Sequence, residues 1–325
     1  MTGPAVSVVI CAYTERRWPD LVAAVASIRE QDRPAAEILL VVDHNPSLAA
    51  RARVVLSDVA VRESPRRRGL SGARNTALDH ATGDIVVFID DDACARPDWL
   101  AQLVAPYADP STLAVGGLAV PRWPSGEAPA VLPPELWWIV GCSFTGQHPA
   151  STGEGVVDVR NVMGCSMSFR RSVLVAVGGF AEDMGRVGAT PLGCEETDVC
   201  IRLRQRHPEG RIVLTPAGVV DHRVGADRVG WGYLLRRSWS EGVSKAVLAR
   251  RVGAADGLST ERSYVLEVLP GALRRELRCG ARAWIGGQAS EAGRRGSAAA
   301  AVVLALAATA AGYLRGRVGR RRRSR

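Results

Sequence analysis

Three consecutive carboxylates, Asp90, Asp91 and Asp92, directly follow a run of five apolar residues, 85–89. A short apolar run behind a glycine predicts a strand that is buried on both faces, as in a parallel sheet. Ligands bind beyond the carboxyl ends of such strands, where these acids would emerge. Paired carboxylates suit a hard divalent cation, so the sequence predicts a site for Mg²⁺ or Mn²⁺. The alternative interpretation is an acidic turn that caps the next helix.

Alternation along the strand gives the three acids different directions. Side chains of an extended chain point to opposite faces in turn, so Asp90 and Asp92 should project one way and Asp91 the other. Adjacent acids repel one another and resist burial, so we expect them to need solvent or a cation.

A second acidic group opens a helix that is predicted from Glu195 to His207. Glu195, Glu196 and Asp198 lie in its first turn, where the helix dipole favours ionised carboxylates. Successive residues are about 100° apart around a helix, so the three acids cannot all face one ligand. Capping of the helix is the alternative role for these acids.

The elements that would position these acids alternate as strand and helix in the first half of the chain. The predicted strands are 6–12, 37–43, 60–64, 85–90 and 113–120, and the predicted helices are 19–29, 46–56, 71–80 and 97–107. This order predicts an α/β fold with a mostly parallel, doubly wound sheet flanked by helices. No GxGxxG or P-loop sequence is present, which argues against a dehydrogenase or an NTPase.

The second half begins with a proline- and glycine-rich stretch, 121–158, which we expect to be an irregular functional loop, as we do for 181–194. Its tryptophans could instead pack the loop onto the sheet. Further strands are predicted at RIVLT and GVVDH, as two separate strands, and helices at 229–251 and 261–284.

The C-terminal stretch 297–314 is uncharged, and arginines flank it on both sides, including the run 320–323. A membrane span needs about 20 apolar residues, so this stretch is marginal. We expect it to lie in the inner leaflet with its arginines on lipid headgroups. A single span and a helix packed on the protein are the alternatives. Nucleic acid is not expected as a partner, because the arginine run lacks interleaved aromatic residues.

The bulk composition supports a folded and intracellular protein. The chain has 325 residues, of which 47% are hydrophobic, enough for a sizeable core. Met1 to Pro4 leads directly into a predicted strand without a basic signal region. We therefore expect a cytoplasmic protein at the inner face of the cell membrane.

Five segments, in this order, resemble the motifs of the family 2 glycosyltransferases, which have the GT-A fold, and of their bacterial members in particular. They are VSVVICAYTE (6–15), VVDHN (41–45), GLSGARNTALDHATGDIVVFIDDDA (69–93), GCEETDVCIRLRQ (193–205) and RRSWSEGVSKA (236–246). The Glu-Glu-Thr sequence in the fourth segment is also similar to that of glucosyl-dolichyl phosphate glucuronosyltransferases, a subgroup of the family.

The resemblance implies a binding site for a nucleotide sugar. Its residues would be Ala12, Tyr13, Glu15, Asp43, Arg74, Asp90 and Asp91. The family pattern implies that Asp43 binds uracil and that Arg74 faces the base and the phosphates. The same pattern implies an Asp-X-Asp metal site formed by Asp92, Asp90 and His222.

The resemblance also implies a catalytic base on the acidic helix. The aspartate that is usual in the family aligns with Glu196, which is one methylene longer. We therefore take Glu196 as the general base, and this departure from the family pattern leaves Asp198 and Glu195 as alternatives.

Together these features imply an inverting glycosyltransferase that moves a sugar from a nucleoside diphosphate, with UDP favoured, to an acceptor hydroxyl. A lipid-linked or cell-envelope acceptor is expected. The alternatives are a sugar-phosphate nucleotidylyltransferase and a non-catalytic, membrane-bound protein that binds sugar nucleotides. The predicted domains are a GT-A catalytic domain (1–225), a helical extension (226–293) and a membrane-associated tail (294–325).

Overall fold

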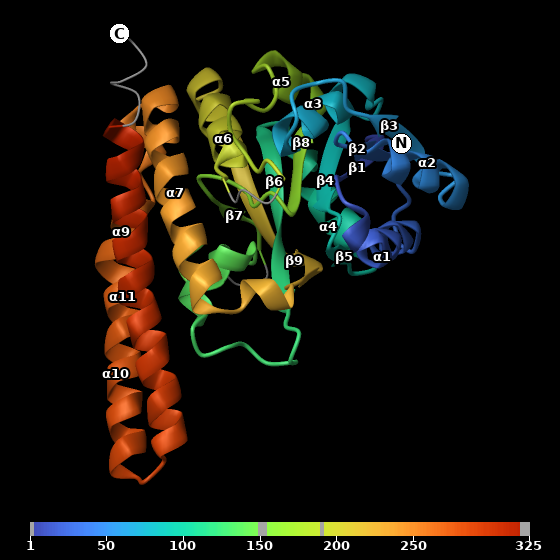
Figure 1. Ribbon diagram of the computed structural model, residues 1–325. Helices are drawn as coiled ribbons and strands as arrows, with labels where there is room; N and C mark the ends of the chain where they lie inside the picture. The colour runs from blue at the N-terminus through green and yellow to red at the C-terminus, as the bar shows by residue number, and fades with distance from the viewer. Residues whose placement is uncertain (1–2, 149–154, 189–191, 319–325) are drawn as a thin grey trace. The chain divides into compact units, whose positions relative to one another are not determined.

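The computed structural model (Figure 1) describes residues 3–148, 155–188 and 192–318, so the arginine run 320–323 lies outside the described residues. The chain divides into two compact units. Unit 1 comprises Met1–Val120, Ser151–Thr190 and Cys194–His222, and unit 2 comprises Pro121–Ala150, Pro191–Gly193 and Arg223–Arg325. The sequence-based division at residues 225 and 293 is a different partition and stays a prediction.

A single sheet forms the centre of unit 1, with the strand order β3-β2-β1-β4-β8-β6-β9-β5 and β7 paired to β9. The strands are β1 (Val6–Ala12), β2 (Glu37–Val42), β3 (Ala60–Glu63), β4 (Ile85–Asp90), β5 (Ala93–Ala95), β6 (Thr112–Arg122), β7 (Val157–Asp158), β8 (Ser166–Arg170) and β9 (Arg211–Arg223). The predicted α/β architecture is confirmed.

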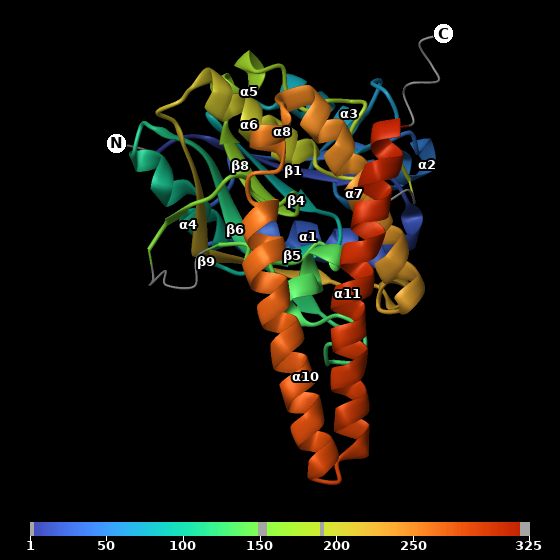
Figure 2. The same ribbon diagram turned by 90° about the vertical axis from the view of Figure 1, so that its left-hand side faces the viewer.

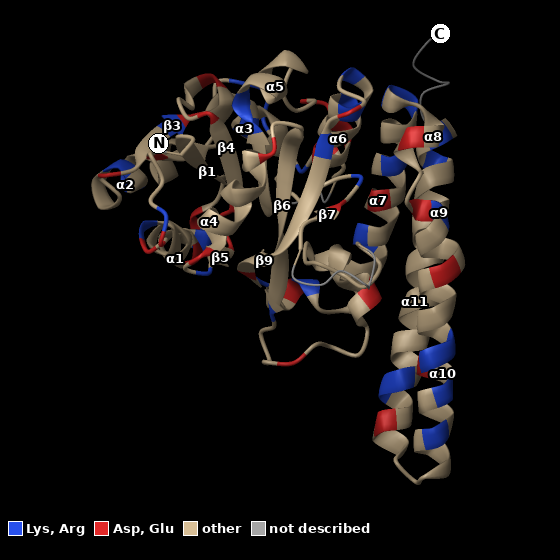
Figure 3. Ribbon diagram, turned by 180° about the vertical axis from the view of Figure 1, so that it is seen from behind, with Lys and Arg blue, Asp and Glu red and all other residues tan. Residues whose placement is uncertain are grey.

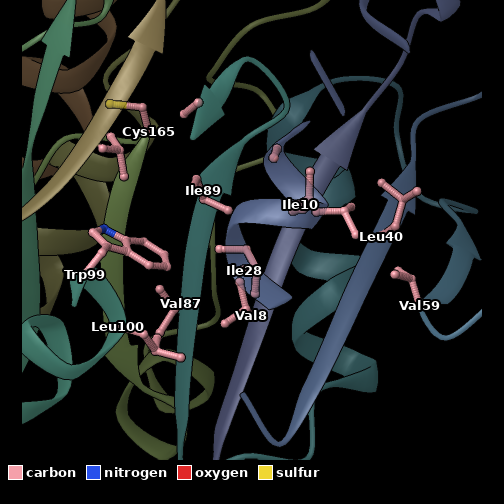
Figure 4. Packing of buried hydrophobic residues seen from close by; sticks show 14 of the residues in the cluster. Val8, Ile10, Ile28, Leu40, Val59, Val87, Ile89, Trp99, Leu100 and Cys165 are labelled. Carbon is pink, nitrogen blue, oxygen red and sulfur yellow. The ribbon is translucent and has the colours of Figure 1, made fainter. Parts of the chain in front are cut away.

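Both faces of the sheet are apolar, which explains the continuous hydrophobic runs in the sequence. Val8, Ile10 and Val87 pack into the core on one face (Figure 4), whereas Val9 and Phe88 pack into a second core on the other. Alternate residues of a strand point to opposite faces. A strand that is buried on both sides therefore does not show the alternation of polar and apolar residues that marks a half-exposed strand.

The sheet is parallel only in its first half. The pairs β1–β2, β1–β4 and β2–β3 are parallel. By contrast, β4–β8, β6–β8 and β5–β9 are antiparallel. The expectation of a mostly parallel sheet thus describes the strand-helix half, where crossover helices separate the strands, and the sheet as a whole is mixed.

The helices of unit 1 correspond closely to the predicted ones. They are η1 (Glu15–Arg17), α1 (Trp18–Arg29), α2 (Pro46–Val55), α3 (Leu70–His80), α4 (Trp99–Val104), η2 (Ala105–Ala108), α5 (Arg171–Ala176) and α6 (Glu195–Arg206). The start of α2 shows why the local sequence was sufficient to predict where this helix begins. The Asn45 side chain accepts a hydrogen bond from the backbone N–H of Leu48, and Pro46 occupies the first turn.

One strand prediction was wrong. The segments RIVLT and GVVDH are parts of the continuous strand β9 and not two strands. Gly218 resembles a turn signal but lies within β9, and the close packing of β9 on β6 requires glycine at position 117, because a Cβ added at Gly117 would lie 2.2 Å from the Gly218 carbonyl oxygen.

Unit 2 is mainly helical. Its elements are η3 (Pro134–Val140), η4 (Ala226–Arg228), α7 (Trp231–Val252), α8 (Ala254–Gly257), α9 (Glu261–Ser263), the π-helical turn η5 (Tyr264–Val268), α10 (Leu269–Ile285) and α11 (Ala289–Val318). Trp123, Trp137 and Trp138 pack against its apolar core, so all three support the loop that carries them. Within the described residues, α11 is the one helix that is long and apolar enough to cross a membrane.

Candidate active site

The register of the parallel strands brings the predicted site residues to one edge of the sheet in unit 1. Cys11 of β1 pairs with Asp90 of β4, and Ala12 pairs with Val42 of β2. Asp43, the residue directly after β2, therefore lies beside the end of β1, and its N–H donates to the Ala12 carbonyl oxygen at 2.8 Å. The carboxyl ends of β1, β2 and β4 thus form one surface, as expected for ligand binding in such sheets.

A cavity of about 320 Å³ opens at the ends of β1 and β2, lined by Tyr13, Asp43, Arg68, Val187 and Gly188. This volume falls within the range of small-molecule sites. Asp43 is buried, accepts a hydrogen bond from the Gly69 N–H at 3.0 Å and lies 2.8 Å from the His44 imidazole. The carboxylate is therefore held in one orientation at the wall of the cavity.

Two other predicted nucleotide-binding residues lie beside this cavity and do not line it. Ala12 is buried and offers its carbonyl oxygen to Asp43. The Glu15 carboxylate accepts a hydrogen bond from the Ser47 hydroxyl at 2.6 Å and lies 3.8 Å from Arg51. The roles of Ala12 and Glu15 in nucleotide binding stay predictions.

Asp90, Asp92 and His222 form a cluster that could hold a metal ion, with their ligand atoms within 4.8 Å of one another. His222 Nε2 lies 3.3 Å from Asp92 Oδ1 and 4.0 Å from Asp90 Oδ2. The antiparallel pairing of β5 and β9 places His222 opposite Ala93, directly after the acids. Two carboxylates and an imidazole are a suitable donor set for Mn²⁺ or Mg²⁺, so the residues fit the predicted cation.

The side chain of Asp91 pairs with Arg17 and is not part of the cation-binding cluster. Its Oδ1 accepts a hydrogen bond from Arg17 Nη1 at 2.7 Å, and the same guanidinium nitrogen lies 3.1 Å from Asp92. Asp91 and Asp92 are 4% and 5% exposed, so they are shielded from solvent and depend on a positive charge, as expected for buried acids. Arg17 supplies the compensating positive charge. Burial and the neighbouring Asp92 still raise the pKa of Asp91 to about 7.

Arg74 connects the cation-binding cluster to the acidic helix. It is 2% exposed, donates from Nη1 to Glu195 Oε1 at 2.7 Å and from Nη2 to the Gly164 carbonyl at 2.9 Å, and lies 3.7 Å from Asp90. Burial lowers the pKa of Arg74, but the charges of Glu195 and Asp90 outweigh this effect and raise it. The guanidinium is therefore a buried cation between two acidic groups, and its predicted contact with phosphate stays a prediction.

The three acids at the start of α6 have different environments. Glu195 is buried against Arg74, and Asp198 is completely buried and accepts a hydrogen bond from Arg202 at 2.8 Å. Glu196 alone among them is partly exposed to solvent. It is therefore the acid of this group that an acceptor could reach.

Two residues with unusual backbone conformations adjoin the site. His44 (φ 51°) and Cys194 (φ 70°) are the non-glycine residues with positive φ in the described part of the chain. They lie next to Asp43 and Glu195, respectively. Strained backbone of this kind tends to occur at functional sites, where neighbouring contacts hold it in place.

The sequence analysis missed Arg17 and Arg68. Each has a signal in the sequence, because Arg17 follows the first strand by only a few residues and Arg68 ends the basic run 66–68 just before α3. A basic residue next to the carboxyl end of a strand that also carries acids is a candidate for charge compensation or ligand binding.

The α/β architecture of unit 1, with acids at the strand ends, places this protein in the GT-A fold class. The solved structure of the mannosyltransferase PcManGT from Pyrobaculum calidifontis, in complex with GDP-Man and Mn²⁺, is similar over 98% of this chain and 89% of its own, with a TM-score of 0.61 and 23% identity. This likeness shows the fold.

The chain belongs to glycosyl transferase family 2, whose sequence model matches residues 7–177. It is 35% identical over 247 residues to the glucosyl-dolichyl phosphate glucuronosyltransferase of Haloferax volcanii, covering 75% of this chain and 77% of the relative. It is also 25% identical over 248 residues to the succinoglycan biosynthesis protein ExoM of Rhizobium meliloti, covering 72% and 71%. The predicted family is confirmed.

Proposed function

We propose that this protein transfers a sugar from a nucleoside diphosphate, with UDP favoured, to an acceptor hydroxyl with inversion at the anomeric carbon. Residues 1–225 would carry the reaction. The observation that supports this most directly is the buried Arg74–Glu195 ion pair. It joins the cation-binding acids to the helix turn on which Glu196 is partly exposed.

Each part of the site has a role in this proposal. Asp43 and Tyr13 hold the base of the donor in the cavity at the strand ends. Glu196 accepts the proton of the acceptor hydroxyl as its oxygen attacks the anomeric carbon from the side opposite the diphosphate. Attack from that side accounts for inversion. The loop that contributes Val187 and Gly188 to the cavity would help to exclude water from the donor.

Asp90, Asp92 and His222 would hold Mg²⁺ or Mn²⁺. A divalent ion at this position neutralises negative charge on the departing diphosphate. The GDP-Man and Mn²⁺ in the PcManGT complex support a nucleotide sugar and a divalent ion as ligands of this fold.

A lipid-linked acceptor at the inner face of the cell membrane is part of the proposal. The name of the Haloferax volcanii relative includes a glucosyl-dolichyl phosphate, which supports this class of acceptor. A precursor of a cell-envelope glycan would satisfy the same chemistry, because it also presents a sugar hydroxyl at a membrane.

A thermal-shift screen of UDP-, GDP- and TDP-sugars, each with and without Mn²⁺, tests the donor and the metal together. We expect one sugar nucleotide to raise Tm only when Mn²⁺ is present. Ligand at about 100 times Kd adds roughly 2.7 kcal/mol to the free energy of unfolding. Asp92→Asn should remove this shift, because it replaces a carboxylate of the cation site with a neutral amide. An equal shift in EDTA, or an unchanged one in Asp92→Asn, contradicts the proposed metal site.

Asp43→Asn should weaken donor binding by about tenfold or more, because loss of a charge-assisted hydrogen bond costs roughly 1.5–3 kcal/mol. Calorimetric titration with the nucleoside diphosphate in the presence of Mn²⁺ measures this effect. Asp58→Asn is the matched control, since Asp58 is an exposed acid that pairs with Arg29 outside the cavity. Equal affinities of the two variants would remove Asp43 from the base site.

A further inference from the structure

The C-terminal half of the apolar helix α11 packs against α7. Its Gly312 is so close to α7 that an added Cβ would lie 2.1 Å from the Trp239 carbonyl oxygen. On α7, a Cβ at Gly242 would lie 2.0 Å from the Thr309 carbonyl oxygen, and Gly316 faces Ala246 in the same way. The backbones of α7 and α11 are therefore in direct contact over residues 309–316.

This contact shortens the part of α11 that could lie in a bilayer. The charged residues Arg237, Glu241 and Lys245 of α7 would be costly in hydrocarbon, so the part of α11 that touches α7 stays outside it. The uncharged stretch that remains, 296–308, has thirteen residues, whereas a span needs about 20. The packed-helix interpretation of this segment, one of those left open by the sequence, agrees best with these contacts.

A different helix presents an unpartnered apolar surface. Figure 2 shows α10 and α11 side by side as an antiparallel hairpin, and Leu269, Ala272 and Ala283 form the buried side of α10. On the opposite side, Leu277, Trp284 and Ile285 are 56%, 71% and 85% exposed. We call this surface the α10 outer face. Large side chains with such exposure mark a binding surface when they gather on one side of a helix.

The charged residues on the α10 outer face are all basic. Arg274, Arg278 and Arg282 are exposed between and beside the apolar side chains, and Figure 3 shows basic residues gathered along α10. The acid of this helix, Glu276, is buried on the other side, where it pairs with Arg275 and Arg295. Tryptophan and aliphatic residues interspersed with arginine, without acids, suit the interface of an anionic bilayer, where arginine reaches the headgroups.

We propose that the α10 outer face docks on an anionic lipid surface and lies in its plane, and that α11 is a packed helix behind it and not a span. The charge complementarity of the arginines with anionic headgroups identifies the occupant. This inference extends the proposed membrane-linked acceptor to a defined docking surface, and its test requires neither donor nor acceptor. Its failure would therefore leave the transfer reaction untouched.

Flotation of the full chain with vesicles tests the docking surface. We expect binding to vesicles of phosphatidylglycerol and phosphatidylcholine, weaker binding to phosphatidylcholine alone, and release by high salt or alkaline carbonate. The triple variant Leu277→Ser/Trp284→Ser/Ile285→Ser should bind the anionic vesicles about tenfold more weakly or worse. Arg278→Gln/Arg282→Gln should lose most of the preference for anionic lipid.

Val54→Ser/Val55→Ser provides the matched control, because these exposed valines of α2 lie on unit 1 and should not affect binding. An unchanged Tm of the triple variant confirms that it folds. Retention in membranes after carbonate treatment would establish a span and overturn the proposal. Normal vesicle binding by the triple variant would also overturn it. If its self-association in ultracentrifugation were lost at the same time, the occupant would be a second copy of the chain.

A further variant tests the contribution of the terminal arginine run separately from that of the α10 outer face. In this variant, arginines 320–323 are replaced by glutamine. We expect this variant to keep most of its binding to the anionic vesicles. If it alone loses binding while the triple variant binds normally, the docking element is the arginine run and the α10 outer face is not.

Discussion

Glu196→Gln should lower kcat for sugar transfer by about 10²–10⁴-fold while leaving donor affinity unchanged, because a general base contributes about that much to the rate. The amide keeps the size of the side chain but cannot accept the acceptor proton. Because Glu196 is partly exposed, its replacement should leave Tm close to that of the wild type. Initial rates with a saturating donor and titration with the nucleotide measure the two effects separately.

Asp198→Asn is the variant against which this result is judged. Asp198 is fully buried and paired with Arg202, so its replacement should lower Tm through the loss of a buried ion pair. The folded fraction of Asp198→Asn should retain substantial transfer. Glu196→Asp, which shortens the side chain to the length usual in the family, should be more active than Glu196→Gln.

The opposite pattern would relocate the base. If Glu196→Gln transferred sugar at the wild-type rate and folded Asp198→Asn did not, the buried aspartate would have to become accessible during catalysis. Glu196 is assigned as the general base because it is partly exposed and Asp198 is buried, so this pair of variants tests the assignment directly.

The first half of the fold was predictable because its central strands β1, β2 and β4 are largely buried on both faces. Each of these three strands is mainly one apolar run, and β4 ends in acids whose direction follows from alternation. Asp43 and Asp90 could therefore be assigned to one edge of the sheet from the sequence. In the second half, β9 was predicted as two strands although it is continuous through Gly218, whose backbone lies close to Gly117 of β6.

The pairing of buried charges could not be predicted in the same way. Arg74 contacts Glu195, which is 121 residues away in the chain, and Arg17 contacts Asp91, 74 residues away. No local period encodes such a pair. The family resemblance implied that Arg74 faces the base and the phosphates of the donor, which stays a prediction, whereas its contacts with Glu195 and the Gly164 carbonyl were not predicted.

Arg74→Met should lower the free energy of unfolding by about 3–5 kcal/mol, because it leaves the buried Glu195 carboxylate without its partner. Among the residues that the structure describes, the Glu195 Oε2 atom has no hydrogen-bond partner, so none of them offers an alternative donor in place. Denaturant unfolding measures the loss. Arg66→Met is the matched control, since this partly exposed arginine just before α3 pairs with Asp79 and Glu182 at the surface and should contribute about 0–1 kcal/mol.

A double-mutant cycle separates the pair from the effects of each side chain. Arg74→Met/Glu195→Gln should be more stable than the sum of the two single losses predicts, by about 0.5–3 kcal/mol, because the unpaired charge is removed. Additive losses would mean that the two residues do not interact across the site. Arg74→Lys should recover only part of the stability, since a single ammonium replaces a planar fork that serves Glu195 and the Gly164 carbonyl together.

The activity of the same variants distinguishes a purely structural pair from one that positions the catalytic helix turn. Glu195 precedes Glu196, so loss of its anchor should displace the general base relative to the donor site. We expect folded Arg74→Met/Glu195→Gln to have a much lower kcat with saturating donor at a temperature well below its Tm. If kcat instead stays at the wild-type value, the pair serves stability alone, and the position of Glu196 must be maintained by other contacts of α6.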